Sequence, residues 1–522
     1  MMQSDRATLF TPAEAPRNQT EVYAVHGADP EVLAYAMAKY SRSALSMKES
    51  LREISTQRAE HFLNTFYFQY GHRSIADLAH IAFAIERLSL LAAIILVDEP
   101  RWDGQERSTR YQNFQKSGWF LPDFTASPAH RAVFTEGVEA LFAEYHSCSE
   151  AMFAHLKGRT PRPAEMKEET YNRALRARAF DISRYLLPLA TNTSLGQIVN
   201  ARTLEAQISR LLSDPHEEVR QLGERLREAA AGSAWNSQGE ALSKLQREIA
   251  ALDPALGADA EALLSREVRI APTLVKYAAA NDYATRTRSE LTQAASELMK
   301  GAPVDLPAGV VDLLDNEPLE IDLATTLLYR VSHYPYRQIA RQVKSLDEAR
   351  RNELIALGAS DRGRHDELLR EFSCGQSLRF DILMDIGGFR DMHRHRRCIQ
   401  ILQPFTSAHG YEIPEGLAEA GLRPVYDAAM SQAHEAFIHV SRAGQTENAR
   451  YVLPLGTRTR ALFKMDFAEA LYIAELRSAP AGHFSYRRVA WEMYQAVAQR
   501  HPALAQYFRV ADIHEPVDLL QR

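Results

Sequence analysis

Most of the chain carries the pattern of helices. Ala, Leu, Glu, Arg and Gln are frequent, and apolar residues recur at intervals of three and four, as in Leu204, Ile208, Leu211, Leu212 and Val219. This periodicity is typical of one face of an α-helix. The longest apolar run extends from Leu88 to Val97, which is too short to cross a bilayer and predicts a buried helix.

Strand patterns are few and short. Residues 81–85 (Ile-Ala-Phe-Ala-Ile) and 378–383 (Leu-Arg-Phe-Asp-Ile-Leu) favour strands, and each precedes a predicted helix. A few short strands among many helices predict an α+β fold, in which a small sheet is backed by helices.

A ten-residue sequence occurs twice in the chain. Residues 184–193 (RYLLPLATNT) and 450–459 (RYVLPLGTRT) are identical at seven of ten positions. A second motif, Pro-x-Leu-x-x-Tyr-x4-Asp, follows each copy, at 272–282 and at 502–512. Two motifs in the same order indicate a tandem duplication. We therefore expect two α+β units, unit one at residues 21–285 and unit two at residues 319–522. Residues 286–318 are the predicted linker between them, and residues 1–20 are a predicted flexible tail.

Composition narrows the class of protein. The chain has 522 residues, too many for one ordinary core, and its 25% charged and 46% hydrophobic residues are average for a globular protein. Its net charge of −6 argues against general nucleic-acid binding. Three cysteines without a CxxC pair indicate neither a disulfide framework nor a metal site. Because no apolar signal segment opens the chain, we expect a cytoplasmic protein without a membrane partner.

Charged motifs are divided unevenly between the units. Residues 393–397 of unit two are His-Arg-His-Arg-Arg, whereas the matching residues 97–101 of unit one are Val-Asp-Glu-Pro-Arg. Residues 106–111 of unit one are Glu-Arg-Ser-Thr-Arg-Tyr, whereas residues 402–407 of unit two lack Ser-x-Arg. Either motif alone is common at a solvated helix end or in a loop. Their order, ahead of Arg-Tyr-x-Leu-Pro-Leu, is the informative feature.

This ordered set resembles the motifs of the flavin-dependent thymidylate synthases. That family has Arg-His-Arg and Ser-x-Arg-Tyr, preceded by Gly-His-x-Ser/Thr and followed by Arg-x-x-Leu-Pro and Asn-Ala-Arg-Ser/Thr-Leu. Here residues 71–74 (Gly-His-Arg-Ser) resemble the first element and residues 200–204 (Asn-Ala-Arg-Thr-Leu) the last. The resemblance covers nearly all of both units. Because the family forms homotetramers of one-unit chains, it implies a homodimer here.

In that family each active site combines two groups of residues from neighbouring subunits. The resemblance puts the first group in unit two, as Arg394, His395, Arg396 and Arg477. It puts the complementary group in unit one, as Glu106, Ser108, Arg110, Arg184, Asn200 and Arg202. Unit one has Leu211 at the place of Arg477, with Arg210 adjacent, and unit two has Asp-Phe-Ala at 466–468 in place of Asn-Ala-Arg. Because the losses are reciprocal, we expect one functional kind of site, shared by both units.

The resemblance implies reductive methylation of dUMP to dTMP, with FAD as cofactor and with methylenetetrahydrofolate and NADPH as co-substrates. Arg110 and Arg184, with the Ser108 hydroxyl, would hold the nucleotide phosphate. Arg477 would be catalytic, because it would stabilise negative charge on the uracil N3 and O4. The implied FAD contacts are Arg394, His395, Arg396, Asn200, Arg202, Glu106, His72 and Ser74, of which Arg394 and Glu106 would also contact the nucleotide.

Three departures from the family pattern leave alternatives open. At the place of the family's first motif serine, unit one has Asp103 and unit two has Ile399. Asp391 stands where the family has a glutamine before Arg-His-Arg. Unit two has Cys-Gly-Gln-Ser at 374–377 in place of Gly-His-x-Thr. An acid beside uracil would change base selection. The alternatives are a flavoprotein that acts on another pyrimidine nucleotide and a non-catalytic member of the family.

Overall fold

The computed structural model describes residues 23, 25, 27–39, 46–53, 73–305, 309–363, 366, 369–373, 376 and 378–520. The predicted tail at 1–20 and the predicted FAD contact His72 lie outside the described residues. Within the described part of the chain, no helix is both long enough and apolar enough to cross a membrane.

The first unit contains a three-stranded antiparallel sheet with the order β1-β3-β2. Its strands are β1 (His80–Ser89), β2 (Asp103–Glu106) and β3 (Asn192–Asn200). Its helices are α1 (Pro30–Lys39), α2 (Met47–Glu53), α4 (Leu90–Leu96), α5 (Pro128–Arg159), α6 (Glu168–Ser183), α7 (Ala201–Leu212), α8 (Glu217–Ala231), α9 (Gly239–Leu252) and α10 (Pro254–Leu264), with 3-10 turns η2 (Arg73–Leu78) and η3 (Arg184–Leu186).

The second unit contains a four-stranded antiparallel sheet with the order β4-β5-β7-β6. Its strands are β4 (Val311–Leu313), β5 (Leu378–Asp385), β6 (Ile399–Leu402) and β7 (Arg458–Met465). Its helices are α12 (Leu319–Arg330), α13 (Tyr336–Ser345), α14 (Glu348–Leu357), α15 (Ile386–Met392), α16 (Arg423–Arg442), α17 (Thr446–Ala449), α18 (Phe467–Ser478), α19 (Phe484–Arg500) and α20 (Pro502–Ala505), with 3-10 turns η4 (Arg370–Phe372) and η5 (Arg450–Val452).

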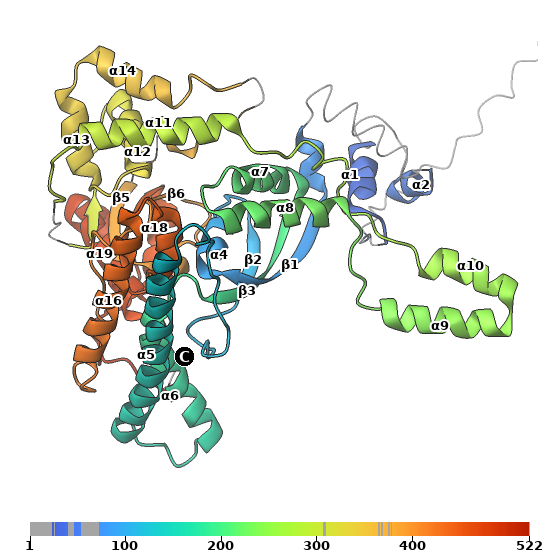
Figure 1. Cartoon of the computed structure of the whole chain (residues 1–522), viewed down its shortest axis with the longest axis horizontal. Coiled ribbons are helices and arrows are strands. Elements are labelled where there is room, and N and C mark those ends of the chain that lie inside the picture. Colours follow the sequence, from blue (N-terminus) through green and yellow to red (C-terminus); the bar gives the residue numbers. More distant parts are fainter. Residues whose placement is uncertain are drawn as a thin grey trace, which may run out of the picture.

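The predicted α+β class, with small sheets backed by helices, is confirmed (Figure 1). Both predicted strands are present, as β1 and β5, and the apolar run after Leu88 forms the buried helix α4. The pattern from Leu204 to Val219 is two helices instead of one, because Pro215 lacks a backbone N–H and separates α7 from α8. The stretch 286–318, predicted as a linker, holds most of α11 (Asp282–Leu298) and strand β4, so the domain boundaries stay a prediction.

The two copies of the repeated sequence pair with each other around a local pseudo-two-fold axis. Leu189 N–H donates to the carbonyl of Leu453, and Leu455 N–H donates to the carbonyl of Leu187, both at 2.9 Å. Pro188 and Pro454 form an antiparallel bridge between these bonds. Because equivalent residues exchange equivalent bonds, the duplicated motif itself joins the two units.

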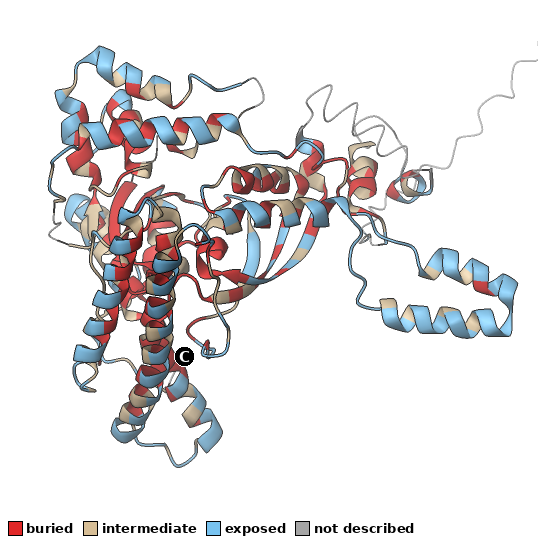
Figure 2. Ribbon diagram, in the orientation of Figure 1, coloured by how far each residue is buried: buried red, intermediate tan, exposed pale blue. Residues whose placement is uncertain are grey.

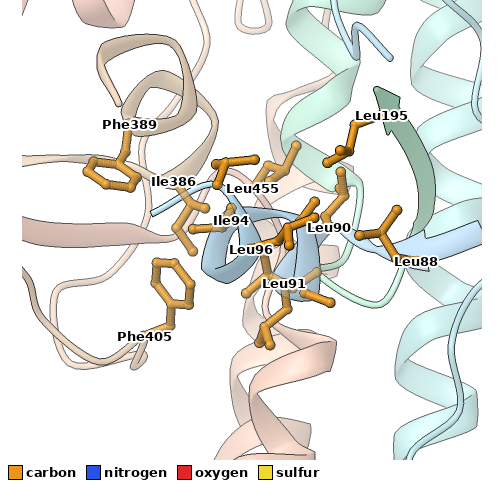
Figure 3. Packing of buried hydrophobic residues seen from close by; sticks show 14 of the residues in the cluster. Leu88, Leu90, Leu91, Ile94, Leu96, Leu195, Ile386, Phe389, Phe405 and Leu455 are labelled. Carbon is orange, nitrogen blue, oxygen red and sulfur yellow. The ribbon is translucent and has the colours of Figure 1, made fainter. Parts of the chain in front are cut away.

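One hydrophobic core runs through both units. Figure 3 shows side chains of α4, such as Ile94, packed near Ile386, Phe389 and Leu455 of unit two. A second, smaller core lies among α11–α14 and the sheet of unit two. In contrast, α9 has no buried residue, and the α9–α10 hairpin is largely exposed in Figure 2.

Candidate functional site

The last turn of α15 and the basic segment that follows it lie beside strand β2 of unit one and the preceding Trp102. Arg390 donates from Nη2 to Glu106 Oε1 at 2.6 Å, and Arg394 donates from Nη2 to Gln105 Oε1 at 2.9 Å. The guanidinium of Arg396 lies 5.3 Å from the ring centroid of Trp102. Asp385 caps the first turn of α15, and this short helix ends at Met392, just before the basic residues. The segments that carry the two predicted groups therefore lie side by side within one chain.

Asp181, near the end of α6, organises the charged residues at this contact. Its two carboxylate oxygens accept from Nε and Nη2 of Arg110 at 2.9 and 3.1 Å. Nδ1 of His483 lies 3.1 Å from Asp181 Oδ1, and Nε of Arg184 lies 3.4 Å from the same oxygen. Burial alone would raise the pKa of Asp181, but His483, Arg184 and Arg110 together hold that pKa well below its usual range. Asp181 is therefore a permanent anion.

Arg110 joins the two units. Besides its two bonds to Asp181, it donates from Nη1 to the Tyr486 hydroxyl at 2.8 Å and from Nη2 to the carbonyl of Ala481 at 3.1 Å. These four bonds occupy most of the five N–H donors of a guanidinium. Burial would lower the pKa of Arg110, but the contact with Asp181 raises it above its usual value. Its geometry is that of a structural clamp, with little capacity left for a ligand.

Arg184 and Arg390, one from each unit, are less fully paired. Their Nη1 atoms lie 3.4 and 3.3 Å from the same acceptor, the buried hydroxyl of Thr109. The remaining bonds of Arg184 are long, 3.4 Å from Nη1 and Nη2 to Oδ2 of Asp391. In both arginines Nε is buried and makes no hydrogen bond to a described residue, although Nε of Arg184 lies 3.4 Å from Asp181 Oδ1. Two guanidinium groups with unpartnered donors, meeting at one point, are suited to hold an anion.

Arg477 contacts His395, so two residues of the predicted first group touch each other. Nε of Arg477 donates to Nε2 of His395 at 2.8 Å, and the guanidinium lies 5.5 Å from the ring centroid of Tyr486. Burial first, and then Arg477, Arg394 and Arg396, lower the pKa of His395 to about 3. His395 is therefore neutral near pH 7 and can accept the bond from Arg477.

The other predicted residues lie at a distance from this cluster or have local roles. The Ser108 hydroxyl accepts from the N–H of Arg110 at 3.2 Å. Asn200 caps α7 by accepting from the N–H of Thr203, and Arg202 lies 3.5 Å from Asp77. Asn200 is five residues along β3 from Leu195, the partner of Glu106, or about 17 Å away. Ser74 is exposed in η2.

The equivalent positions on the other side of the pseudo-two-fold axis have a different chemistry. Counting from the helix caps Ser89 and Asp385, the residues of unit one that match Arg390 and Asp391 are Ile94 and Ile95. Arg210 pairs with Glu99 at 2.7 Å, as Arg477 contacts His395. Arg210 therefore makes the contact in unit one that Arg477 makes in unit two, although Leu211 is the residue that aligns with Arg477 in sequence. No comparable pair of under-bonded arginines is found on this side among the described residues.

Four residues of the cluster were missed from the sequence: Asp181, Arg390, His483 and Tyr486. Arg390 could have been found, because it lies four residues before Arg394 and therefore on the same side of a helical turn. Asp181 lies three residues before Arg184, the spacing of a helical ion pair. His483 and Tyr486 had no local signal, because α19 reaches the cluster only through tertiary packing.

The fold and the cluster define a class of protein: a duplicated α+β protein with a site of arginine residues between its two units. Residues 23–234 and 309–503 match the family described as thymidylate synthase complementing protein. The chain belongs to this family, that of the flavin-dependent thymidylate synthases.

Similar proteins cover either the whole chain or part of it. A protein of Chlamydia muridarum named "UPF0159 protein" is 29% identical over 514 residues, which are 93% of this chain and 91% of that protein. The "Flavin-dependent thymidylate synthase" of Clostridium tetani is 25% identical over 179 residues, 34% of this chain and 67% of that protein. The crystal structure of a UMP/dUMP methylase PolB from Streptomyces cacaoi, bound with 5-Br dUMP, is 17% identical, with a TM-score of 0.30, and covers 40% of this chain and 88% of that chain.

Proposed function

We propose that the chain is a flavoenzyme that carries out FAD-dependent reductive methylation of dUMP to dTMP, at the site between its two units. The observation that carries this proposal is the pair Arg184 and Arg390, whose Nη1 atoms share the Thr109 hydroxyl as an acceptor and whose buried Nε atoms make no hydrogen bond to a described residue. The phosphate of a nucleotide would take bonds from both guanidinium groups. In this arrangement Arg184 binds the phosphate, as predicted, and Arg390 is a second phosphate ligand. Arg110 holds Asp181 in place, and Asp181 in turn pairs with Arg184.

The charge of the cluster supports a phosphate ligand. Five arginines, Arg110, Arg184, Arg390, Arg394 and Arg477, lie with three carboxylates, Glu106, Asp181 and Asp391. His395 is neutral, and Glu469 pairs with Arg397 at 3.9 Å. These eight side chains carry a surplus of two positive charges, and a phosphate monoester carries close to two negative charges at pH 7.

FAD fits the open part of the same surface. Arg394 is exposed and its bond to Gln105 uses one donor, so it can hold a phosphate of the cofactor. The rings of Trp102 and Tyr472 lie beside Arg396 and His395 and can contact a flat ring system. When bound, FAD supplies hydride transfer, with NADPH as the reductant and methylenetetrahydrofolate as the carbon donor. Asn200 and Arg202 would contact the far end of the cofactor.

In this proposal the chain's own residues bind and orient the nucleotide. Arg477 presents its guanidinium beside the ring of Tyr486, and the neutral His395 fixes its direction by accepting the Nε–H bond. A guanidinium held in this way stabilises negative charge that develops on the uracil N3 and O4. We further propose that two chains form a homodimer, which brings four units together.

A second candidate function is favoured by one residue. Asp391 lies on the wall of the site with its side chain 20% exposed, and it contacts Arg184. A carboxylate only accepts hydrogen bonds, so it favours a base that presents N–H donors, such as the amino group of cytosine. A flavoprotein acting on another pyrimidine nucleotide is therefore the alternative. Titration with dUMP, UMP and dCMP separates the two, because the preferred nucleotide should bind at least about tenfold more tightly.

Binding of dUMP to the purified flavoprotein tests the main proposal. We expect a flavin absorbance spectrum that dUMP perturbs. Arg184→Ala and Arg390→Ala should each weaken dUMP binding by about 30- to 1000-fold, roughly 2–4 kcal/mol. Arg450→Ala is the matched control, because Arg450 occupies the equivalent repeat position in the other unit. Unchanged dUMP affinity in both test variants, or an equal loss in Arg450→Ala, would overturn the assignment of this site.

A further inference from the structure

Helices α9 and α10 form a hairpin that projects away from both sheets (Figure 1). A Cβ at Gly257 of α10 would lie 2.6 Å from Ala250 Cβ of α9, so the two helices are in close contact. The residues that match the family stop at 234 and resume at 309, which leaves the hairpin outside the match. The proposed reaction therefore gives this segment no role.

The hairpin exposes a concentration of apolar side chains. Among the described residues, six of the sixteen exposed large hydrophobic side chains lie between Trp235 and Val268. Four of these six form what we call the leucine face: Leu245, Leu252, Leu256 and Leu263, with exposed fractions of 46, 88, 57 and 78%. No residue of α9 is buried. Helices of this length are marginally stable in water by themselves, and clustered apolar side chains mark a surface that another molecule covers.

The four leucines lie on one face of the hairpin. In each helix they are seven residues apart, which is close to two turns. The less exposed residues mark the side of each helix that faces the other: Leu242 and Ile249 in α9, and Ala260 and Leu264 in α10. At 100° per residue, the exposed leucines are rotated from that side by about 60–70°, in the same sense in both helices. Because the helices are antiparallel, equal rotation places all four leucines on the same face.

The charge of the hairpin narrows the kind of partner. Residues 239–264 contain five acidic and two basic side chains. Nucleic acids and anionic membrane surfaces are bound by surfaces rich in Lys and Arg. The leucine face is therefore suited to another protein surface.

We propose that the leucine face packs against the same face of a second copy of this chain, so that two hairpins form an antiparallel four-helix bundle around a two-fold axis. A contact of this kind needs only one self-complementary surface. With the axis parallel to the helices, α9 of one copy lies against α10 of the other and runs antiparallel to it. Both bases of the hairpin, Lys244 and Arg247, are in α9, whereas the charged residues of α10 are the acids Asp259 and Glu261, so the opposed helices complement each other.

The size of the face fits a contact between two copies. Helix α9 has 14 residues and is therefore about 21 Å long, and two helices side by side are about 20 Å wide. The outline of the face is thus roughly 400 Å² in each copy and roughly 800 Å² in the pair. Because helical surfaces are ridged, the accessible area that is buried exceeds this outline and approaches the about 1,200 Å² at which specific interfaces begin. The contact is independent of the proposed reaction and of its arginine cluster.

Sedimentation equilibrium of the full chain tests the proposal. We expect the wild type to be a dimer at micromolar concentration. Leu252→Glu combined with Leu263→Glu should raise the dissociation constant of the dimer at least about 100-fold, because four leucines of the pair would no longer be buried. Ser243→Glu combined with Ala258→Glu is the matched control, because both residues are exposed and rotated in the opposite sense from the leucine face, so this variant should stay a dimer.

Disulfide trapping tests the same contact without that variant. Leu252 and Leu256 lie at the same end of the hairpin, so Leu252 of one copy would meet Leu256 of the other. A mixture of Leu252→Cys chains and Leu256→Cys chains should therefore form covalent dimers faster than either variant alone, because a disulfide requires close Cα atoms.

Three results would each overturn the proposal: a wild type that is monomeric at tens of micromolar, a dimer that survives the double glutamate substitution, or equal trapping in the mixture and in the single variants. A dimer that survives would leave the homodimer proposed above in place, formed through other surfaces. Binding of dUMP should be the same in the glutamate variant and its control, so failure of this contact is distinguishable from failure of the proposed function.

Discussion

At the scale of single residues, equivalent arginines have opposite electrostatic environments. Arg184 and Arg450 occupy the same position of the repeated sequence, where Arg184 is buried and Arg450 is half-buried. Burial would lower the pKa of Arg184, but Asp181 and Asp391 raise it. Burial lowers the pKa of Arg450, and the more distant Glu447, 3.8 Å away, does not restore it. Nearby carboxylates thus stabilise the charge of the arginine in unit one, and they stabilise the charge of the equivalent arginine in unit two less well.

Replacing Arg110 tests its role as a clamp. Arg110→Met leaves Asp181 without its bidentate partner and removes the donor to the Tyr486 hydroxyl. Because a buried carboxylate then loses a paired charge, we expect the free energy of unfolding to fall by about 3–5 kcal/mol, measured by urea denaturation.

Arg450→Met is the control for that substitution. An under-paired, half-buried guanidinium can be replaced by an apolar side chain of similar volume at little cost, so we expect a change within about 1 kcal/mol. Equal losses in the two variants would mean that Asp181 does not depend on Arg110.

Buried histidines predict loss of stability in mild acid. Burial is the largest cause that lowers the pKa of His393 and His434 to about 4 and of His395 to about 3. In the unfolded chain these groups titrate near pH 6.5, so the unfolded state binds more protons below that pH. Stability contributed by the neutral rings is present above about pH 6.5 and is lost as pH falls toward their folded pKa values.

The contribution of His395 can be measured separately. In wild type the free energy of unfolding, measured by urea denaturation, should fall between pH 7 and pH 5. In His395→Gln this fall should be smaller by about 1–2 kcal/mol at pH 5. His439→Gln, at an exposed histidine of α16, should leave the slope unchanged. If both variants keep the wild-type slope, the His395 ring is not held neutral in the folded protein.

At the scale of elements, the repeated sequence is also the joint between the units. Each copy runs through a 3-10 turn into a proline bridge and then into an inner strand of its sheet, β3 or β7. The two copies differ at Ala190 and Gly456, which both donate across the axis, to Tyr451 and Tyr185. The difference follows from packing, since a Cβ at Gly456 would lie 2.7 Å from the Tyr426 hydroxyl and 3.2 Å from Met430 Cε.

Gly456→Ala is therefore expected to destabilise the protein, although alanine occupies the equivalent position of the first copy. The clash with Tyr426 predicts a loss of about 1–3 kcal/mol in the free energy of unfolding. Adding Tyr426→Phe removes the hydroxyl that clashes, so the double variant should lose less than the sum of the single variants. Strict additivity would show that the hydroxyl is not what excludes a Cβ there.

At the scale of the whole molecule, the segments that carry the two predicted residue groups lie together inside one chain. Arg390 and Arg394 of unit two touch Glu106 and Gln105 of unit one without a second chain. Mixtures of Arg394→Ala and Arg184→Ala chains should therefore not recover dUMP binding, because every site in a mixed dimer keeps one defect. Isothermal titration of the mixture measures this. If dUMP binding returned in a quarter to a half of the sites, Arg394 and Arg184 of one site would have to come from different chains.

The sequence by itself determined the features that depend on local pattern. The alternation and apolar runs near Ile81 and Leu378 are intrinsic to strands, so β1 and β5 were predictable. The duplication and the family motifs were also visible in the linear order of residues. Strand β2 was not predictable, because its sequence Asp-Gly-Gln-Glu has no strand preference and becomes a strand only by pairing with β3.

The tertiary structure alone decided which charges neutralise one another. The sequence indicated both Arg110 and Arg184 as phosphate ligands, but Asp181 and Tyr486 take most donors of Arg110, whereas Nε of Arg184 makes no hydrogen bond to a described residue and only a 3.4 Å ion pair with Asp181. Tyr486 is distant in sequence from Arg110 and reaches it through the packing of unit two on unit one. Donor and acceptor pairing depends on distances of a few ångströms, which residue order does not specify across two folded units.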